Sequence, residues 1–590
     1  MEETIYKIVS SKAKQRKVGF IVLGFLIFSV MMIPTKIVLV KMLPGKSANT
    51  FTVYVDTATN STINQTKEVV ECVANVFKKE EEVVNMEMFL GQGAPLDYAG
   101  LVKGSAFKRL KNQAEIVINL TDKHGREEAS YMMVHRLRPI VQEKCENFYK
   151  GTTVKFVEMP SGPPTFATIV VNLYGKDSLL LRQTSKTVES SLKETEGLVD
   201  IDVMQDDVYK KYEIIPNVEK IISSNLSVEQ VSNVLYMAFR GNVVATKNSM
   251  LQQDQIPIFV SLDEETRTLD NANRDELALK LSRLKLLNRE GIMVPVKEVV
   301  EIVPTIADPT IFKKNMRNMV SVTAECDLVS QVYPLMDARE LMISKLEADF
   351  DIERLTGMST YMFDLALVHK QTGEKVLVRW DGEMKVSLDT FRDLGGAFIS
   401  ALVLMFLLMV VYYKSFILSG IVLMGSFLSI IGVIIGHFIT DIISLVLTDV
   451  HFYLTATSLI GFISLMGISA RSSLLLIDFT KSLIESGVEK NRAIAISTAT
   501  RAKPILLTAV AIILGSLLLA TDPIFGGLGI ALIFGSMAST LVSLYYIPVL
   551  MAKTQAICPL NGEKVCEEGE GLDKENMDVT DIPPEVHHSS

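Results

Sequence analysis

Residues 467–508 read GISARSSLLLIDFTKSLIESGVEKNRAIAISTATRAKPILLT and place Arg471 inside a long apolar segment. No acidic residue lies within the apolar core of that segment to pair with the arginine. A cation at the centre of a bilayer costs about 2.5–3.5 kcal/mol on insertion scales, so membrane proteins rarely keep one without a use. The stretch therefore predicts a membrane-spanning helix with a functional cation whose counter-ions come from elsewhere.

The composition fits a membrane protein with a large polar part. The chain has 590 residues, of which 48% are hydrophobic and 22% are charged. Its formal net charge of −9 gives no electrostatic support for nucleic-acid binding. Five cysteines are present, and the three in the polar part are an odd number, which argues against a disulfide framework. The residue patterns imply no covalent chemistry, so we do not expect an enzyme.

Six segments are long and apolar enough to cross a bilayer, which takes about 20 residues. They lie at 18–40, 394–413, 417–439, 452–474, 504–521 and 529–551, with spans two to six inside 391–552. Lys and Arg gather in an amphipathic leader, residues 1–17, and in the loop after the fourth span. This bias predicts that both termini are cytoplasmic and that residues 41–393 face outward. The acidic tail, 553–590, is predicted to be disordered.

The outward part has the pattern of an α/β protein. Between residues 41 and 162, alternating and helical patterns follow in the order β-α-β-β-α-β, which is the ferredoxin-like split βαβ pattern. A second unit of this kind occupies 163–206 and resumes at 316–390, and the interval 207–315 is predicted to be an insertion. The fold class is therefore an α+β membrane protein with six transmembrane helices and a large outward domain.

Several motifs resemble the C-terminal half of resistance-nodulation-division (RND) efflux permeases, over residues 5 to 552. They are VKMLPGKSANTFTVYVD, GAPLDYAGLVKG, INLTDKHGREEAS, VEMPSGPP, GISARSSLLLIDF, RAKPILLTA and DPIFGGLGIALIFGSMASTLVSLYYIPVL. The set most resembles the exporters of drugs and organic solutes. The resemblance implies ferredoxin-like porter subdomains and an inserted docking subdomain in the periplasm, anchored in a bacterial inner membrane.

The resemblance also implies roles in proton coupling. Arg471 occupies the position where the family has a basic residue facing proton-carrying aspartates, and Thr508 and Arg501 match polar positions of its proton relay. The aspartates have no counterpart here, and the chain starts at a domain boundary of the family. We therefore expect a half-transporter that needs an N-terminal-half partner, with H⁺ as coupling ion and no bound cofactor or metal.

Simpler interpretations of these residues stay open. Arg471 is compatible with a snorkelling arginine, Thr508 with a threonine bonded to its own helix, and Arg501 with positive-inside anchoring. The acidic residues nearest the membrane are expected at segment ends, where Asp478 has Arg501 as one candidate partner. Small residues such as Ser469 and Ser473 are expected to permit close helix packing. The acidic residues in question are Asp441, Asp478 and Asp522.

A glycine-containing stretch, FLGQGAPLDYAG, lies where the family has a gate loop between two substrate pockets. Glycine permits positive φ and a mobile backbone. The resemblance therefore assigns the substrate path to Phe89, Gly91, Gly93 and Pro95. The alternative is an ordinary loop between strands.

Partners follow from the resemblance as well. It implies a trimer of such paired halves, a periplasmic adaptor protein, an outer-membrane channel, the lipid bilayer and no nucleic acid. Three alternatives stay open: a SecDF-type auxiliary subunit of protein translocation, a heavy-metal (Cu/Ag) RND half, and a non-transporting scaffold half. Arg471 replaces the acidic residue usual in the SecDF type. The methionines available to a soft metal are scattered, at Met86, Met88 and Met159.

Overall fold

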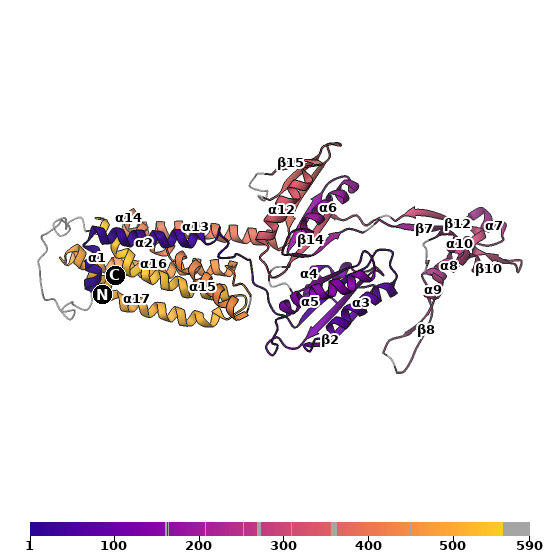
Figure 1. The fold of residues 1–590 in the computed structure, drawn as a ribbon, viewed down its shortest axis with the longest axis horizontal. Coiled ribbons are helices and arrows are strands. Elements are labelled where there is room, and N and C mark those ends of the chain that lie inside the picture. Colours follow the sequence, from indigo (N-terminus) through magenta and orange to yellow (C-terminus); the bar gives the residue numbers. More distant parts are fainter. Residues whose placement is uncertain are drawn as a thin grey trace.

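The computed structural model describes residues 1–558, apart from 160–161, 163, 207, 252, 268, 270–272, 308, 356–362 and 449. The molecule is elongated, with a helical bundle at one end, two α/β units in the middle and a small inserted part at the far end (Figure 1). Most of the predicted acidic tail lies outside the described residues. Its first residues pack against the bundle, where Ile557 is fully buried.

The bundle contains the helices that the apolar segments predict. Five helical segments of the described chain are long and apolar enough to cross a membrane, with α14 and α15 counting as one and α18 to α19 as another. The first apolar segment forms α2, so the predicted count of six remains a prediction. The bounds are α1 (Glu2–Val9), α2 (Lys12–Met31), α13 (Glu383–Tyr413), α14 (Phe416–Phe427), α15 (Ile430–Thr448), α16 (Ala456–Glu485), α17 (Lys490–Ala520), α18 (Gly526–Leu541), a π-helical turn (Val542–Tyr546) and α19 (Ile547–Lys553).

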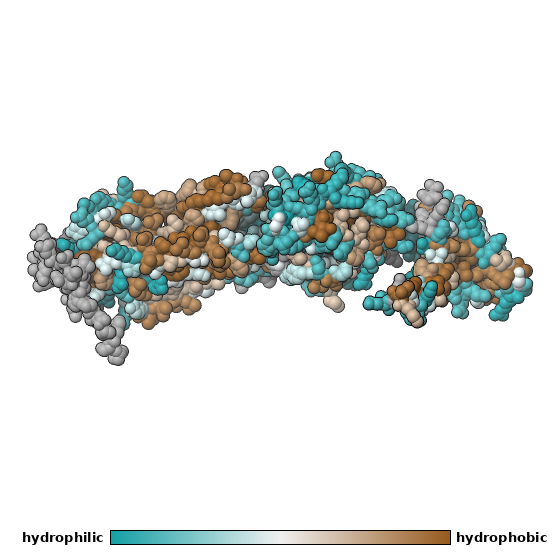
Figure 2. Space-filling view, turned by 90° about the horizontal axis from the view of Figure 1, so that it is seen from below, coloured by the Kyte–Doolittle hydropathy of each residue, from teal (hydrophilic) through white to brown (hydrophobic). Residues whose placement is uncertain are grey.

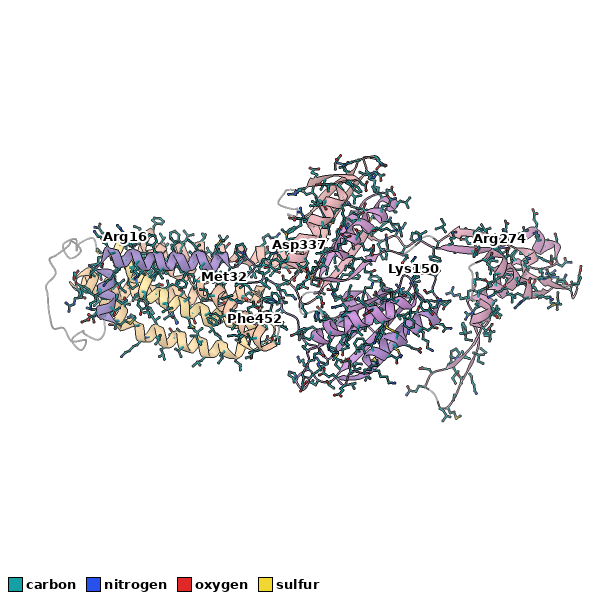
Figure 3. All side chains as sticks on the ribbon, viewed as in Figure 1. Arg16, Met32, Lys150, Arg274, Asp337 and Phe452 are labelled. Carbon is teal, nitrogen blue, oxygen red and sulfur yellow. A yellow bond between two sulfur atoms is a disulfide. The ribbon has the colours of Figure 1, made fainter. Side chains whose placement is uncertain are left out.

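The surface of the bundle is apolar, whereas the surface of the α/β units is polar (Figure 2). Side chains such as Leu408, Val411 and Leu518 are 65%, 76% and 84% exposed on its helices. In Figure 3, Arg16 marks the free end of the bundle, while Met32 and Phe452 lie near the α/β units. This distribution is the one expected of a bundle that sits in a bilayer, since lipid rather than water solvates the apolar belt.

Glycines set the spacing between three of the helices. A Cβ on Gly432 of α15 would lie 2.2 Å from the carbonyl oxygen of Phe534 in α18. A Cβ on Gly535 of α18 would lie 2.3 Å from the side chain of Leu465 in α16. At Gly432, α15 therefore approaches the backbone of α18 directly, and at Gly535 the Leu465 side chain of α16 packs onto α18, as small residues allow in membranes.

The first α/β unit (residues 50–157) is a four-stranded sheet with two helices on one face. The sheet order is β2-β3-β1-β4, and each neighbouring pair is antiparallel. Its core joins apolar residues of both helices and the strands. The elements are β1 (Thr50–Asp56), α3 (Ile63–Phe77), β2 (Val83–Leu90), α4 (Tyr98–Lys103), a 3₁₀ turn (Ser105–Phe107), β3 (Gln113–Leu120), α5 (Ser130–Cys145), a second 3₁₀ turn (Glu146–Phe148) and β4 (Thr153–Val157).

A disulfide joins Cys72 of α3 to Cys145 of α5. The sequence-based argument against a disulfide was therefore wrong. The two helices pack side by side on the same sheet, which brings the two Cα atoms to 5.8 Å. The odd cysteine of the three is Cys326, which is free and lies in the other α/β unit.

The second α/β unit (residues 169–204 and 317–381) has its own core, which shares no residue with the first in the described chain. The sheet order is β13-β14-β5-β17-β16-β15, and β6 pairs with β14. The elements are β5 (Ile169–Tyr174), α6 (Ser178–Lys193), β6 (Leu198–Met204), β13 (Lys313–Lys314), β14 (Arg317–Cys326), α12 (Val332–Leu346), β15 (Phe350–Arg354), β16 (Leu365–His369) and β17 (Lys375–Asp381).

The inserted part is carried on a two-stranded ribbon, β7 with β12, and has a separate small core. It lies at the end of the molecule opposite the bundle (Figure 1). The elements are β7 (Lys210–Pro216), α7 (Val218–Ser223), α8 (Val228–Phe239), β8 (Asn242–Lys247), β9 (Ile256–Val260), α9 (Glu264–Arg267), α10 (Arg274–Arg283), β10 (Lys285–Leu287), β11 (Met293–Pro295), α11 (Val296–Val299) and β12 (Val300–Ile306).

Backbone hydrogen bonds join the bundle to the α/β units at the start of α16. Lys41 N donates to Leu454 O at 3.1 Å, and Ala456 N donates to Met42 O at 3.1 Å. The hydroxyl of Tyr453 donates to the carbonyl of Leu328, just after β14, at 2.7 Å. The N-terminus of α16 and the residues just before it are thereby bonded both to the segment that enters the first α/β unit and to the second unit.

Candidate functional site

Arg471 lies at the middle of α16, a helix of 30 residues and about 45 Å long. The helix begins at a capping box in which Thr455 and Ser458 satisfy each other's backbone N–H groups. Exposed residues recur every three or four positions along it, which defines one face. That face carries Ile460, Ser464, Gly467, Arg471 and Leu475. Arg471 therefore projects from the flank of the bundle rather than into its core.

No ion pair or hydrogen bond reaches the Arg471 side chain from the described part of the chain. Two acidic residues of the bundle, Asp478 and Asp441, have other partners. Asp478 accepts a hydrogen bond from the hydroxyl of Tyr412 in α13 at 3.3 Å. Asp441 is buried and accepts from Phe452 N at 2.7 Å.

Two of these carboxylates lie further inside helices than the sequence predicted. Asp441 and Asp478 fall within α15 and α16, because both helices continue beyond the apolar segments that hydropathy detects. Asp522 is at a segment end as expected, where it accepts from Ile524 N and Phe525 N, both at 2.8 Å. No described contact joins Asp478 to Arg501, the partner considered for it.

The other two residues assigned to coupling lie on α17. The guanidinium of Arg501 stacks over the ring of Phe479 at 4.9 Å from the ring centroid, and its Nε has no hydrogen-bond partner among the described residues. The hydroxyl of Thr508 donates to Ile505 O at 2.9 Å, which is the bond to its own helix that a threonine commonly makes. Neither residue contacts Arg471 in this conformation.

Small hydroxyl residues fill the buried face of α16 beside Arg471. Ser469 and Ser473 are fully buried, and their hydroxyls have no partner among the described residues. A Cβ on Gly425 of α14 would come within 2.8 Å of the Ser473 oxygen. Gly425 and Ser473 therefore let α14 approach α16 closely at this point, as small residues allow.

The predicted gate loop follows β2 and leads into α4. Phe89 is half-buried near the end of β2, and Gly91 has φ of +69°, which favours glycine. A Cβ on Gly93 would lie 2.3 Å from Ser105 O, so this glycine permits a close backbone approach. Pro95 is exposed. The loop therefore joins a strand to a short helix rather than two strands.

A buried carboxylate fixes the centre of this loop. Glu115 of β3 is 1% exposed and accepts hydrogen bonds from Ala94 N at 3.0 Å and from the Ser105 hydroxyl at 2.5 Å. Sequence reasoning missed this residue, because an acidic side chain on the face away from the helices predicts solvent. The loop covers that face and so buries the carboxylate. The loop and the short helices that follow it expose apolar side chains, at Leu96, Tyr98, Leu101 and Phe107.

A cavity of about 130 Å³ lies between the two α/β units, next to the segment that leaves the bundle. It is lined by both charged and apolar side chains. Met159 lines it, whereas Met88 is half exposed on β2, so these two methionines do not gather into one thioether site. The charged lining residues are Lys41, Lys103, Arg138, Glu158, Glu325 and Glu383.

Comparisons with known proteins match most of the chain. The family model for the AcrB/AcrD/AcrF family matches residues 2–353 and 358–555. The multidrug export protein AcrF of Escherichia coli (strain K12) is 21% identical over 517 residues, which are 86% of this chain and 45% of AcrF. The swarming motility protein SwrC of Bacillus subtilis (strain 168) is 22% identical over 385 residues, which are 64% of this chain and 32% of SwrC.

A solved structure described as a heavy metal efflux pump shares the fold. It superposes with a TM-score of 0.68 at 16% sequence identity, over 93% of this chain and 51% of that one. The chain thus spans between a third and a half of the length of these curated relatives and about half of the solved structure.

Proposed function

Because the chain belongs to the AcrB/AcrD/AcrF family of RND permeases, we propose that it supplies one half of a proton-driven exporter of drugs or organic solutes. Members of this family are transporters rather than enzymes. The proposed partner is an N-terminal-half permease subunit that carries the proton-binding aspartates. Three such pairs would assemble in the inner membrane with a periplasmic adaptor and an outer-membrane channel.

One observation carries this proposal: Arg471 is exposed on the apolar flank of the bundle without a described counter-ion. Leaving a cation in lipid costs about 2.5–3.5 kcal/mol on insertion scales. Carboxylates on a neighbouring helix of another subunit would remove that cost. Their protonation would weaken the attraction to Arg471, which makes the contact a switch with two arrangements.

The energy available is sufficient for such a switch. One elementary charge that moves through 100 mV is worth about 2.3 kcal/mol. The exposed face of α16 beside Arg471 carries Ser464 and Gly467, and a Cβ on Gly467 would meet nothing within 4 Å. These small residues leave room for a partner helix. Arg501 and Thr508 are proposed to act as secondary relay groups on α17, after rearrangement on assembly.

Motion of α16 has a direct route to the rest of the molecule. The N-terminus of α16 is bonded to Met42, and the residues just before the helix, Tyr453 and Leu454, are bonded to the second α/β unit and to Lys41. We assign the two α/β units to the porter and the inserted part to docking. The substrate path would run beside Phe89, Gly91, Gly93 and Pro95, whose loop is flanked by exposed apolar side chains.

The test is the Arg471→Ala variant, expressed together with the N-terminal-half subunit found by co-purification and mass spectrometry. The variant is expected to assemble but to lose proton-dependent efflux, whereas Arg471→Lys retains it because the charge is preserved. Lys481→Ala removes a cation from the same helix and serves as the matched control. Wild-type efflux by Arg471→Ala would overturn the coupling role.

Co-purification also separates the alternatives. A transporter half is expected to bind a membrane partner with paired intramembrane carboxylates. If the chain purifies with a stoichiometric partner that lacks them, the scaffold or translocation alternatives replace the proposal.

A further inference from the structure

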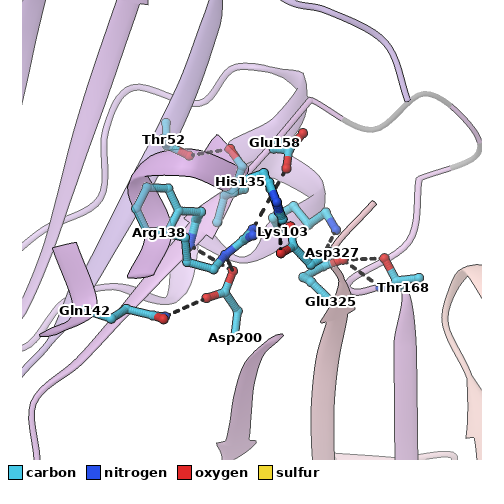
Figure 4. Close-up of polar contacts among 12 residues, drawn as sticks. Thr52, Lys103, His135, Arg138, Gln142, Glu158, Thr168, Asp200, Glu325 and Asp327 are labelled. Atoms are coloured by element: carbon cyan, nitrogen blue, oxygen red, sulfur yellow. Dashed lines mark hydrogen bonds and ion pairs between the residues drawn. The ribbon is translucent and has the colours of Figure 1, made fainter. Parts of the chain in front are cut away.

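A cluster of charged side chains joins the two α/β units (Figure 4). Arg138 of α5 donates through Nε to Asp200 of β6 at 3.2 Å and through Nη1 to Asp327 at 2.6 Å. The side chains of Arg138 and Asp200 are only 5% and 2% exposed. His135 Nδ1 lies 2.7 Å from the second oxygen of Asp327. A nearly buried guanidinium of the first unit is therefore held between two carboxylates of the second.

Two further ion pairs around Arg138 also join a basic residue of the first unit to an acidic residue of the second. Lys155 Nζ donates to Asp202 at 2.5 Å, and Lys103 Nζ donates to Glu325 at 2.6 Å. Asp200 also accepts from Phe156 N at 3.2 Å. In these contacts the first unit supplies the donors and the second unit supplies the carboxylates. Since the hydrophobic cores of the two units are separate, charge pairing is a principal attachment between them.

The backbone presents Asp200 to Arg138 in an unusual conformation. Asp200 has φ of +51°, which costs a non-glycine residue of the order of 1–3 kcal/mol. It lies opposite a register shift of β14 between Thr323 and Glu325. Such irregularities redirect a side chain from the plane of its sheet. The strained backbone conformation of Asp200 therefore lies at the contact with Arg138 of the first unit.

The cluster borders the cavity between the units. Arg138 Nη2 lies 4.0 Å from Glu158 Oε1, and Glu158 lines the cavity together with the free thiol of Cys326. Burial raises the pKa of Asp200 to about 6, and burial raises the pKa of Glu158 to about 7, although Arg138 acts to lower both. The remaining charged groups that face the cluster are Lys41, Lys103, His135, Lys155, Asp202, Glu325, Asp327 and Glu383.

We propose that this cluster is a proton-sensitive clamp that holds the two α/β units together in acid and loosens as the pH rises. Carboxylates outnumber the cation at the buried centre, because Asp200 and Asp327 share the Arg138 guanidinium and Glu158 Oε1 lies 4.0 Å from it, so a proton on one of them relieves their repulsion. If opening returns Asp200 to water, its pKa falls to the ordinary value, so the closed state binds protons more tightly than the open state. Protons therefore favour closure, and this contribution is lost as the pH rises through about 6.

The size of the effect is worked from Asp200 alone, because the Glu158 side chain is 38% exposed at the cavity and contributes a smaller share of the pH dependence. A pKa that moves from 3.8 to about 6 is a change of about two units. Each unit is a tenfold change in equilibrium, so the ratio of closed to open molecules falls on the order of a hundredfold between about pH 4 and about pH 7.

The thiol of Cys326 is a native reporter of opening. It is half-buried in the lining of the cavity, and burial raises its pKa well above the usual range, so separation of the two units should speed its reaction. The full-length chain is treated with a dithiodipyridine, which reacts with thiols in acid, between about pH 5 and about pH 8. Modification of Cys326 is counted by peptide mass spectrometry and divided by its rate in denatured chain at the same pH.

The normalised rate in wild type is expected to rise by at least tenfold across this range. In Asp200→Asn the rate stays low and flat, because the neutral amide cannot titrate and its oxygen still accepts from Arg138. Glu189→Gln on α6 removes an exposed carboxylate that pairs with Lys193 and should behave as wild type. The Cys326→Ser variant lacks the reporter thiol and gives the background signal of the assay.

A flat or falling wild-type profile overturns the clamp. If Asp200→Asn does not fold, Glu158→Gln at the cavity takes its place and is expected to reduce the pH dependence of the Cys326 modification rate. An unchanged pH dependence in a folded Glu158→Gln variant also overturns the clamp. The role of the clamp rests on the proposed function. The assay needs neither partner nor transport, however, so its failure leaves the coupling proposal for Arg471 intact.

Discussion

Removal of the Cys72–Cys145 disulfide should destabilise the first α/β unit by an amount that the loop length predicts. The bond closes a loop with a sequence separation of 73 residues. In the chain-entropy account, a loop of this length restricts the unfolded chain by about 4 kcal/mol at 25 °C. The double variant Cys72→Ser/Cys145→Ser is therefore expected to lose about 4 kcal/mol of unfolding free energy in that unit.

Hydrogen–deuterium exchange of the full-length chain measures this loss locally. Because about 1.4 kcal/mol is a tenfold change in an equilibrium constant, protection of the β1 and β3 amides should fall on the order of a thousandfold. The second unit has a separate core, so β5 is the internal standard. The single tryptophan, Trp380, is 3% exposed in that second core, and its emission should not change.

Two controls make the result decisive. Reduction of the wild-type chain should reproduce the effect of the double variant, whereas Cys326→Ser should leave β1 protection unchanged because this thiol is free. A loss of less than about tenfold in β1, or an equal loss in β5, would refute the loop-closure reasoning for this unit.

Two further outcomes concern the loop and the bundle. Glu115→Ala removes the acceptor of the Ala94 N–H and the Ser105 hydroxyl, which should lower the free energy of unfolding by about 1–3 kcal/mol. Amide exchange of the loop after β2 should become faster. Unchanged exchange would show that the carboxylate does not hold the loop. Gly432→Ala should lower the melting temperature of the detergent-solubilised chain, because its Cβ would lie 2.2 Å from a carbonyl oxygen of α18. Gly420→Ala is the matched control, since a Cβ there would meet nothing within 4 Å. Equal shifts of the melting temperature in both variants would contradict the packing argument.

Hydropathy located the apolar segments but not the ends of the helices. The second predicted span starts at residue 394, whereas α13 begins at Glu383, directly after β17. The fifth predicted span starts at 504, whereas α17 begins at Lys490. In both cases the added turns contain charged and polar residues, and the helix continues through them because its backbone groups bond to one another whether lipid or water surrounds them. Apolar length therefore gives the membrane depth and underestimates the helix.

The contacts that join distant segments could not be predicted from the sequence. Arg138 and Asp327 are 189 positions apart, and their pairing depends on how two separately folded units meet. Cys72 and Cys145 become neighbours only once α3 and α5 pack on one sheet. The buried state of Glu115 depends on a loop that folds over its strand. Local periodicity contains no information about any of these three arrangements.

The proposed switch at Arg471 and the proposed clamp would be connected mechanically through α16. A rigid helix transmits axial displacement along its length. The N-terminus of α16 is bonded to the segment that enters the first unit, and Tyr453, just before the helix, is bonded to the second. The two units are attached to this turn by different bonds, so a shift of α16 loads them unequally. Relative motion of the units would strain the ion pairs that join them, of which Arg138 with Asp200 is the most buried among those described. A proton that weakens the contact at Arg471 and a proton that strengthens the clamp would thus act on opposite ends of one connected path.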